Sequence, residues 1–142
     1  MADKFIGKWN LVDSENFDEY MKKVGVGFFA RKFSAFLKPV LTIESIDDHW
    51  KMTSASTFKT SVTEFDIGKE FKEETPDGRK MKSVFNFEGD KLIQQQKAIK
   101  PGDKDSTFER YIEGDKFVVV CKCEDVTSKR TYQRVRDFVV VV

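Results

Sequence analysis

Cysteine and histidine are scarce in this chain of 142 residues, which contains two cysteines and one histidine. Cys121 and Cys123 lie two residues apart, so in a strand they would share one face, and they lack the CxxC spacing of redox and zinc motifs. We interpret both as reduced, structural thiols. His49 alone cannot supply a metal cluster and is interpreted as a surface loop residue, so we expect neither a metal nor a cofactor.

Net charge and long apolar segments are also lacking. The 25 basic and 24 acidic residues give a formal charge of +1, which provides no reason to expect a nucleic acid partner. No segment approaches the roughly 20 apolar residues of a membrane span, and the N-terminus has no signal-peptide core. We therefore expect a cytoplasmic monomer, with nuclear import as an open alternative, built as one domain over residues 1–142.

The first forty residues predict a strand followed by two short helices. Residues 8–12 alternate apolar and polar side chains, which is typical of a strand. Asn16 and Glu19 match a capping box, and Gly25 should end the first helix. The two helices should occupy about residues 16–37. Phenylalanine on one broad side of the second helix fits a helical pair packed on a sheet, and it also indicates a lid over an apolar space.

From residue 40 onward, short strands alternate with turn signals at the spacing expected of an antiparallel sandwich or barrel. Including the opening strand, the pattern contains about nine or ten strands, without an internal repeat or linker. A meander of this length most simply closes on itself, because closure removes exposed strand edges. The predicted fold is mainly β, an up-and-down barrel with a helical hairpin inserted after its first strand.

Arginine falls on strand faces that should be buried. Arg130 and Tyr132 share one face of the strand at residues 127–134, whereas the opposite face is ordinary polar surface. Arg110 shares the apolar face of its own strand with Phe108. A buried guanidinium needs an anionic partner, and the inward faces contain few acids. We interpret that partner as a ligand carboxylate, with an internal Asp or Glu as the alternative.

Serine and glutamine also fall on inward faces. Ser54 and Ser56 share a face with Met52, and residues 94–96 place at least one amide inside, whichever face is inner. A dry core would reject this mixture, because each unpaired buried polar group costs about 1 to 3 kcal/mol. The pattern favours a water-containing cavity for an amphipath with an anionic head and a long apolar body. Binding such a ligand breaks no bond, so we do not expect an enzyme.

Eight short motifs occur in order between residues 5 and 135. They are Gly-Lys-Trp at 7–9, Ser-Glu-Asn-Phe-Asp-Glu-Tyr-Met at 14–21, Gly-Val-Gly at 25–27, Arg-Lys at 31–32, Lys-Pro at 38–39, Ser-Thr-Phe-Lys at 56–59, Glu-Phe at 70–71 and Arg-Thr-Tyr at 130–132. Together they resemble the intracellular fatty acid-binding proteins, the cytosolic lipid-binding proteins of the calycin superfamily. The resemblance implies a ten-stranded, lipocalin-like barrel with a two-helix lid, which binds one long-chain fatty acid inside and transfers it to membranes or other proteins.

The resemblance also implies roles for individual residues. Arg110, Arg130 and Tyr132 match the family's carboxylate-binding trio, with Arg110 reaching the head group directly or through water. Phe58 matches the portal phenylalanine. The other positions that match cavity or portal residues are Phe17, Met21, Ala30, Pro39, Leu41, Ser54, Ser56, Asp77, Arg79, Phe108, Val119 and Cys121.

A basic patch on the lid is the last feature that the resemblance implies. Lys22, Arg31 and Lys32 match positions that in some members serve nuclear import or collisional transfer to anionic membranes. Ordinary solvated helix faces are the alternative interpretation of these three residues.

Two segments depart from the family's pattern. The connection at residues 98–105 is longer than usual, but the spacing from Arg110 to Arg130 is the family's, so the register should survive. The tail at residues 136–142 runs past the usual end of the chain. It could extend the last strand, dock on the barrel exterior, or be foreign to the natural protein.

Three other functions remain open at this point. A retinoic acid carrier of the same superfamily is the first, since that branch resembles the same arginine, arginine, tyrosine arrangement. A retinol carrier is a poorer fit, because Arg110 favours an acid over an alcohol. The second is a protein that acts through its lid surface, by contact with membranes or a receptor. The third is an isomerase in a related barrel, for which the sequence has no evident acid and base pair.

Overall fold

The computed structural model describes residues 2–136, so the predicted tail lies outside the described residues apart from Arg136. Within that range the chain forms ten strands, two α-helices and a short 3-10 helix. In order these are η1 (Ala2–Phe5), β1 (Gly7–Glu15), α1 (Phe17–Val24), α2 (Phe28–Ser34), β2 (Val40–Ile46), β3 (His49–Ala55), β4 (Thr60–Asp66), β5 (Phe71–Glu74), β6 (Lys80–Glu88), β7 (Lys91–Ala98), β8 (Ser106–Glu113), β9 (Lys116–Cys123) and β10 (Val126–Arg134).

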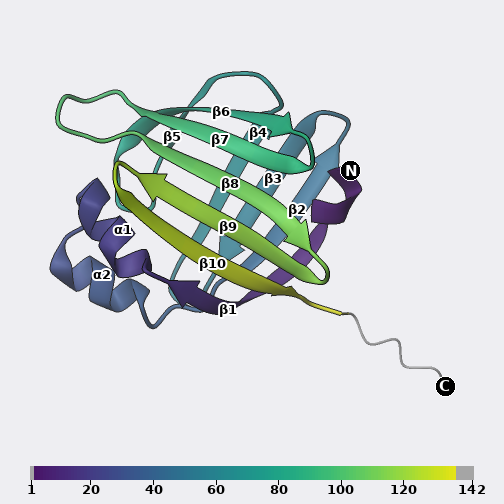
Figure 1. Cartoon of the computed structure of the whole chain (residues 1–142), viewed down its shortest axis with the longest axis horizontal. Coiled ribbons are helices and arrows are strands. Elements are labelled where there is room, and N and C mark those ends of the chain that lie inside the picture. Colours follow the sequence, from purple (N-terminus) through teal and green to yellow (C-terminus); the bar gives the residue numbers. More distant parts are fainter. Residues whose placement is uncertain (1, 137–142) are drawn as a thin grey trace.

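The strands form one sheet in the order β4-β3-β2-β1-β10-β9-β8-β7-β6-β5, with antiparallel neighbours. Every neighbour in this order is also consecutive in the chain except β1 and β10, which join the first and last strands. The sheet curls into a nearly closed barrel, with the helices between β1 and β2 (Figure 1). The predicted up-and-down barrel with an inserted helical hairpin is therefore confirmed.

Side chains fill the space between β4 and β5, the two ends of the strand order. The ring of Phe65 on β4 stacks on Phe71 of β5, with centroids 6.2 Å apart, and on Phe85 of β6 at 3.7 Å. Nearer the lid, the ammonium of Lys59 donates to the carbonyl of Pro76. Aromatic burial thus continues the barrel wall where the strand order ends.

Large aromatic side chains pack beneath η1, which lies at the end of the barrel opposite the helices (Figure 1). The ring of Phe5 lies 5.9 Å from Phe117 and 6.3 Å from Trp50, both edge-on. The indole of Trp9 donates to the carbonyl of Phe5 at 3.1 Å, which satisfies its buried N–H. This group is called the aromatic cluster below and comprises Phe5, Trp9, Trp50, Phe65, Phe85, Phe87 and Phe117.

The first helix, α1, packs on β9 and β10 and buries Tyr20, Met21 and Val24. It ends at Gly25, whose φ of 103° is the left-handed conformation that glycine adopts readily, as predicted. The capping box predicted at its start is wrong. Asn16 is itself left-handed and caps nothing, because its amide donates instead to the carbonyl of Thr127 on β10.

The second helix, α2, buries none of its residues. Its apolar side is open, with Phe29 exposed to 86% and Phe36, just beyond the helix, to 84%. Sheet packing therefore accounts for α1 but not for α2. Among the described residues, neither helix has the length and hydropathy that a bilayer crossing would need.

Candidate functional site

The two predicted arginines lie on the same rung of the barrel wall. Val119 on β9 pairs with Arg110 on β8 and with Arg130 on β10, so the three residues share the inner face. Two strand spacings separate the arginines, about 10 Å between Cα atoms. Tyr132 follows Arg130 by two residues and faces the same way. The predicted register is confirmed, although the β7–β8 connection at residues 99–105 is long.

Arg110 is the most enclosed charged group of the trio. Its Nη1 is buried and has no hydrogen-bond partner among residues 2–136. The guanidinium carbon lies 5.2 Å from the ring of Phe85 and 5.3 Å from that of Phe108, so aromatic faces supply part of the missing stabilisation. Burial lowers the pKa of Arg110 below its ordinary value, which shows how strongly this environment disfavours an unpaired cation.

Arg130 contacts the first lid helix, whereas Tyr132 packs toward the aromatic cluster at the other end of the barrel. The Nη1 of Arg130 donates to Ser14 Oγ at 2.9 Å, and its guanidinium covers the ring of Phe17 at 3.8 Å. Tyr132 is buried, and its ring lies edge-on to Phe117 at 5.8 Å. Phe17 from α1 therefore covers Arg130, whereas Arg110 lies against Phe85 and Phe108 of the barrel wall.

A pocket of about 350 Å³ lies between the two helices and the barrel. Its wall contains four of the predicted site residues together with apolar neighbours, so the lid covers a hollow that reaches Arg130. The lining includes Leu11, Ser14, Phe17, Met21, Arg31 and Arg130. A second hollow of about 390 Å³ beside Gly7 and Arg134 contains none of the predicted site residues, and we assign it no role.

The other predicted cavity positions divide between the interior and the lid end. Leu41 and Ser54 pair across β2 and β3 on the inner face, and Phe108 and Cys121 pair in the same way across β8 and β9. Burial raises the pKa of the Cys121 thiol to about 11, so it stays protonated and fits the predicted structural role.

Four predicted positions lie at the lid end. Ala30 is exposed on α2, and Pro39 immediately precedes β2. Ser56 donates to the carbonyl of Lys59 and shapes the β3–β4 turn. Phe58 in that turn is largely exposed, with its ring 5.4 Å from Phe33. The contact between Phe58 and Phe33 places the turn against α2.

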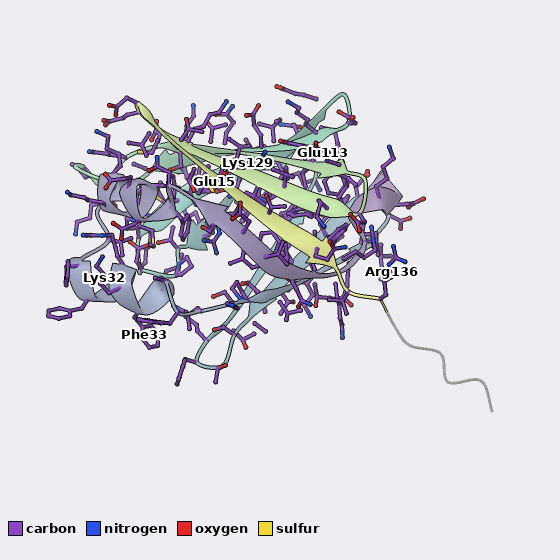
Figure 2. The ribbon with its side chains drawn as sticks, turned by 60° about the horizontal axis from the view of Figure 1, so that its bottom comes forward. Glu15, Lys32, Phe33, Glu113, Lys129 and Arg136 are labelled. Atoms are coloured by element: carbon purple, nitrogen blue, oxygen red, sulfur yellow. The ribbon has the colours of Figure 1, made fainter. Side chains whose placement is uncertain are left out.

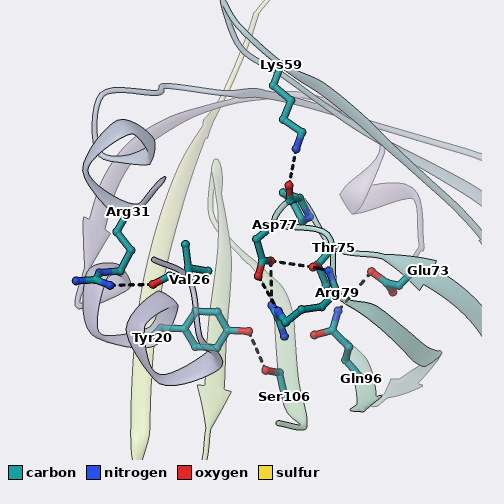
Figure 3. Close-up of polar contacts among 11 residues, drawn as sticks. Tyr20, Val26, Arg31, Lys59, Glu73, Thr75, Asp77, Arg79, Gln96 and Ser106 are labelled. Atoms are coloured by element: carbon teal, nitrogen blue, oxygen red, sulfur yellow. Dashed lines mark hydrogen bonds and ion pairs between the residues drawn. The ribbon is translucent and has the colours of Figure 1, made fainter. Parts of the chain in front are cut away.

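Asp77 and Arg79 form an ion pair within the β5–β6 turn (Figure 3). The Nε and Nη2 of Arg79 donate to the two carboxylate oxygens at 2.8 and 3.2 Å, and Thr75 Oγ1 donates to the same carboxylate at 2.8 Å. Burial alone would raise the pKa of Asp77, but these hydrogen bonds outweigh it and lower the pKa. The turn therefore satisfies the Asp77 carboxylate, whereas the Nη1 of Arg79 is buried without a hydrogen-bond partner in the described part of the chain.

Only two of the three cations in the predicted basic patch are exposed to solvent. Lys22 and Lys32 are exposed, and Figure 2 shows Lys32 beside Phe33 on α2, which projects from one end of the barrel. Arg31 is only 13% exposed, because its guanidinium donates to the carbonyl of Val26 at 2.8 Å and to Asp18 at 3.2 Å. The third cation of the patch is therefore committed to holding the two helices together.

Sequence reasoning missed one inward acid, Glu73 on β5. Its carboxylate accepts hydrogen bonds from the amides of Gln94 and Gln96 on β7. The sequence did indicate the inward position of Glu73, because it shares one strand face with Phe71 and Thr75. A strand of four residues, however, gives only a weak period-two pattern. At least one inward amide was predicted at residues 94–96, and this is confirmed because Gln94 and Gln96 are both buried.

A nearly closed barrel with a helical lid, a pocket beneath it and polar groups on its inner wall defines a class of proteins that enclose a small ligand. Residues 6–135 match the Lipocalin / cytosolic fatty-acid binding protein family, and the chain belongs to this family. Its fatty acid-binding members are carriers of lipids and not enzymes.

Known relatives extend over nearly the whole chain. Fatty acid-binding protein homolog 6 of Caenorhabditis elegans is 49% identical over 134 residues, which cover 94% of this chain and 99% of the relative. The solved structure of the REP1-NXSQ fatty acid transporter superposes with a TM-score of 0.90 at 40% identity, covering 97% of this chain and 100% of that one. A Schistosoma mansoni fatty acid binding protein in complex with arachidonic acid has a TM-score of 0.87 at 36% identity, with 94% and 97% covered.

Proposed function

We propose that this protein is a monomeric, non-enzymatic carrier in the cytoplasm that encloses one long-chain fatty acid and holds its carboxylate with Arg110, Arg130 and Tyr132. The observation that carries the proposal is the buried Nη1 of Arg110, which lacks a hydrogen-bond partner among the described residues. A carboxylate would supply that partner through a charge-assisted hydrogen bond. Arg130, two strands away on the same rung, adds a second positive charge.

The two parts of the ligand have different tasks in this proposal. Each buried methylene contributes about 0.8 kcal/mol, so a long tail can exceed association costs of at least about 4 kcal/mol. The arginines mainly orient the ligand and select an acid, because the carboxylate must leave water in order to pair with them. Affinity should therefore follow tail length, and head-group preference should follow Arg110 and Arg130.

The test compares oleate with methyl oleate on Arg110→Met, which keeps an unbranched, flexible side chain and removes the charge. We expect the preference for the acid over the ester to fall about tenfold, the effect of one charge-assisted hydrogen bond. Lys129→Met is the matched control, since Lys129 is exposed on the outer face of β10 beside Arg130. An unchanged preference in Arg110→Met combined with Arg130→Met would refute the carboxylate site.

The same binding assay separates fatty acids from retinoids. A fluorescent fatty acid bound to the wild-type protein is displaced by oleate and, separately, by all-trans retinoic acid. The proposal expects oleate to act at the lower concentration. Displacement by retinoic acid at a far lower concentration than oleate would make the retinoid carrier the correct function.

We also propose that the lid transfers ligand by touching anionic membranes. Exposed Phe28 and Phe29 adjoin Lys32 on α2, with the Lys32 ammonium 5.4 Å from the Phe28 ring, so apolar and basic groups share one surface. Lys22→Gln with Lys32→Gln should slow transfer to vesicles containing phosphatidylserine and leave the equilibrium affinity unchanged. Equal transfer rates would remove the patch from the proposal, and an unchanged nuclear fraction in cells would remove nuclear import.

A further inference from the structure

The barrel interior contains a second polar group that the carboxylate site does not use. It consists of Glu73 on β5, Ser83 on β6, and Gln94 and Gln96 on β7. Gln94 and Gln96 are 3% and 4% exposed, so their amides are held within the protein. Buried polar side chains persist in folded proteins when their hydrogen bonds are satisfied, and here one of them is not.

The carboxylate of Glu73 organises this group. Its Oε2 accepts from the Nε2 of Gln94 at 2.9 Å. Its Oε1 accepts from the Nε2 of Gln96 at 3.4 Å, and Figure 3 shows Glu73 and Gln96 side by side. Gln94 Nε2 also donates to Ser83 Oγ at 3.1 Å. The partners that the structure gives Glu73 are thus neutral amides, and the group is joined across three strands.

The orientation of the Gln96 amide follows from this chemistry. A carboxylate oxygen accepts and cannot donate, so the NH₂ of Gln96 must face Glu73 and its carbonyl oxygen must face away. That oxygen, Oε1, is buried and has no hydrogen-bond partner in the described part of the chain. The interior therefore presents a fixed acceptor that lacks a donor.

The charges and hydrogen-bonding groups around Gln96 Oε1 determine which donor can bind to it. A second carboxylate would be repelled by Glu73. An ammonium would share the interior with three arginines, Arg79, Arg110 and Arg130, of which Arg79 and Arg110 each have a buried Nη1 without a hydrogen-bond partner in the described part of the chain. A hydroxyl is neutral, donates to Gln96 Oε1 and can accept from an amide or Ser83 in return. An ordered water is the alternative occupant with the same capacity.

The position of the group along the wall indicates which part of a ligand reaches it. Arg110 pairs with Leu92 on β7, and Gln96 lies four residues further along that strand, about 13 Å at the usual rise. A ligand with its carboxylate at Arg110 would bring the middle of its chain to Gln96. We propose that Glu73, Gln94 and Gln96 form a subsite for a mid-chain hydroxyl, so that the protein favours hydroxylated fatty acids, an inference that rests on the proposed carboxylate site.

The experiment measures the ratio of affinities for 12-hydroxystearate and stearate by displacement of a fluorescent fatty acid. Gln96→Met should lower this ratio about tenfold relative to the wild type, the effect of losing one acceptor for a buried hydroxyl. Gln95→Met is the matched control, because Gln95 is exposed on the outer face of the same strand, and it should leave the ratio unchanged. A ratio that stays within about twofold of wild type in Gln96→Met would overturn the subsite.

Two further ligands keep the test independent of how the variants fold. On the wild-type protein, 12-methoxystearate can accept but not donate, so it should bind about tenfold more weakly than 12-hydroxystearate. For 2-hydroxystearate, whose hydroxyl lies beside the carboxylate, the ratio should not respond to Gln96→Met. Equal affinity for the hydroxy and methoxy acids would assign the position at Gln96 Oε1 to water and overturn the subsite. Failure of stearate itself to bind the wild type would overturn the proposed function, whereas stearate binding with an unresponsive ratio would overturn this inference alone.

Discussion

Phenylalanine lies at both ends of this barrel, with opposite burial. The aromatic cluster beneath η1 and along the β4–β5 gap is at most 3% exposed, apart from the partly buried Phe87. The second set, called the lid phenylalanines below, comprises Phe28, Phe29, Phe33, Phe36 and Phe58, and its members are 49% to 86% exposed. The difference arises because inward strand positions face other strands across the barrel, whereas the apolar side of α2 faces solvent.

This contrast has a dynamic consequence. Segments with few buried apolar contacts open at low free-energy cost, whereas segments anchored in the core open only with global unfolding. Helix α2 belongs to the first kind and the aromatic cluster to the second. Between them, α1 is anchored by the Tyr20 hydroxyl, which donates to Ser106 Oγ at 2.9 Å on β8. The lid should therefore move at α2 while α1 stays on the barrel.

The largest effect should come from the aromatic cluster. Phe117→Ala removes a fully buried ring that contacts Phe5 and Trp9, and we expect a loss of about 3 to 5 kcal/mol in the free energy of unfolding. Urea unfolding followed by tryptophan fluorescence measures it. A loss below about 1 kcal/mol would mean that the cluster is not the stabilising centre that its burial indicates.

A smaller effect should come from the anchor between the two regions. Tyr20→Phe removes the hydrogen bond to Ser106, and we expect a loss of about 1 kcal/mol in unfolding free energy. Burial raises the pKa of the Tyr20 hydroxyl, which keeps this donor protonated at neutral pH. Hydrogen exchange should become faster in α1, with Ser106→Ala giving the same pattern. Faster exchange confined to α2 would contradict the proposed anchor.

The lid phenylalanines should barely affect stability. For Phe29→Ala we expect a change within about 0.5 kcal/mol, because the side chain is already exposed in the folded protein. The same variant should slow transfer of a fluorescent fatty acid to anionic vesicles, since an apolar contact with the bilayer is lost. Stopped-flow measurement of transfer for both Phe29→Ala and Phe117→Ala compares the lid phenylalanines with the aromatic cluster. A destabilisation as large as that of Phe117→Ala would end the distinction between the two sets.

The smallest effect concerns the outer wall next to the aromatic cluster. The ring nitrogens of His49 lie 3.1 Å from the carboxylates of Glu64 and Asp66, and these hydrogen bonds, the one to Glu64 first, raise the pKa of His49. We expect its single imidazole signal in NMR to titrate above the ordinary value of about 6.5. Glu64→Gln should lower the midpoint, and a wild-type midpoint below 6.5 would contradict the contact.

The sign of the pH effect on stability follows from that direction. Because the pKa of His49 is raised on folding, its contribution is fully present below the pKa of the unfolded chain. It is lost as the pH rises through the higher pKa of the folded protein. In Glu64→Gln, stability should depend less on pH across that window.

Much of the fold and part of the candidate site could be predicted from local patterns. Period-two alternation predicted the strands, and the spacing between Arg110 and Arg130 predicted a register that the pairing through Val119 confirms. The capping box at Asn16 failed because a tertiary hydrogen bond to Thr127 competed with the local one. Glu73 was missed because a strand as short as β5 carries little periodic signal.

The sequence by itself determined the alternation of strands and turns and the family to which the chain belongs. It also determined that Arg110, Arg130 and Tyr132 lie on inward strand faces. These properties depend on residue order and on a strand period that is the same in every sheet. Only the tertiary structure decided that Arg31 holds the two lid helices together, and that Arg110 Nη1 and Gln96 Oε1 have no hydrogen-bond partner among residues 2–136. Those outcomes depend on which side chains meet across the barrel, and such meetings are set by packing between strands far apart in the chain.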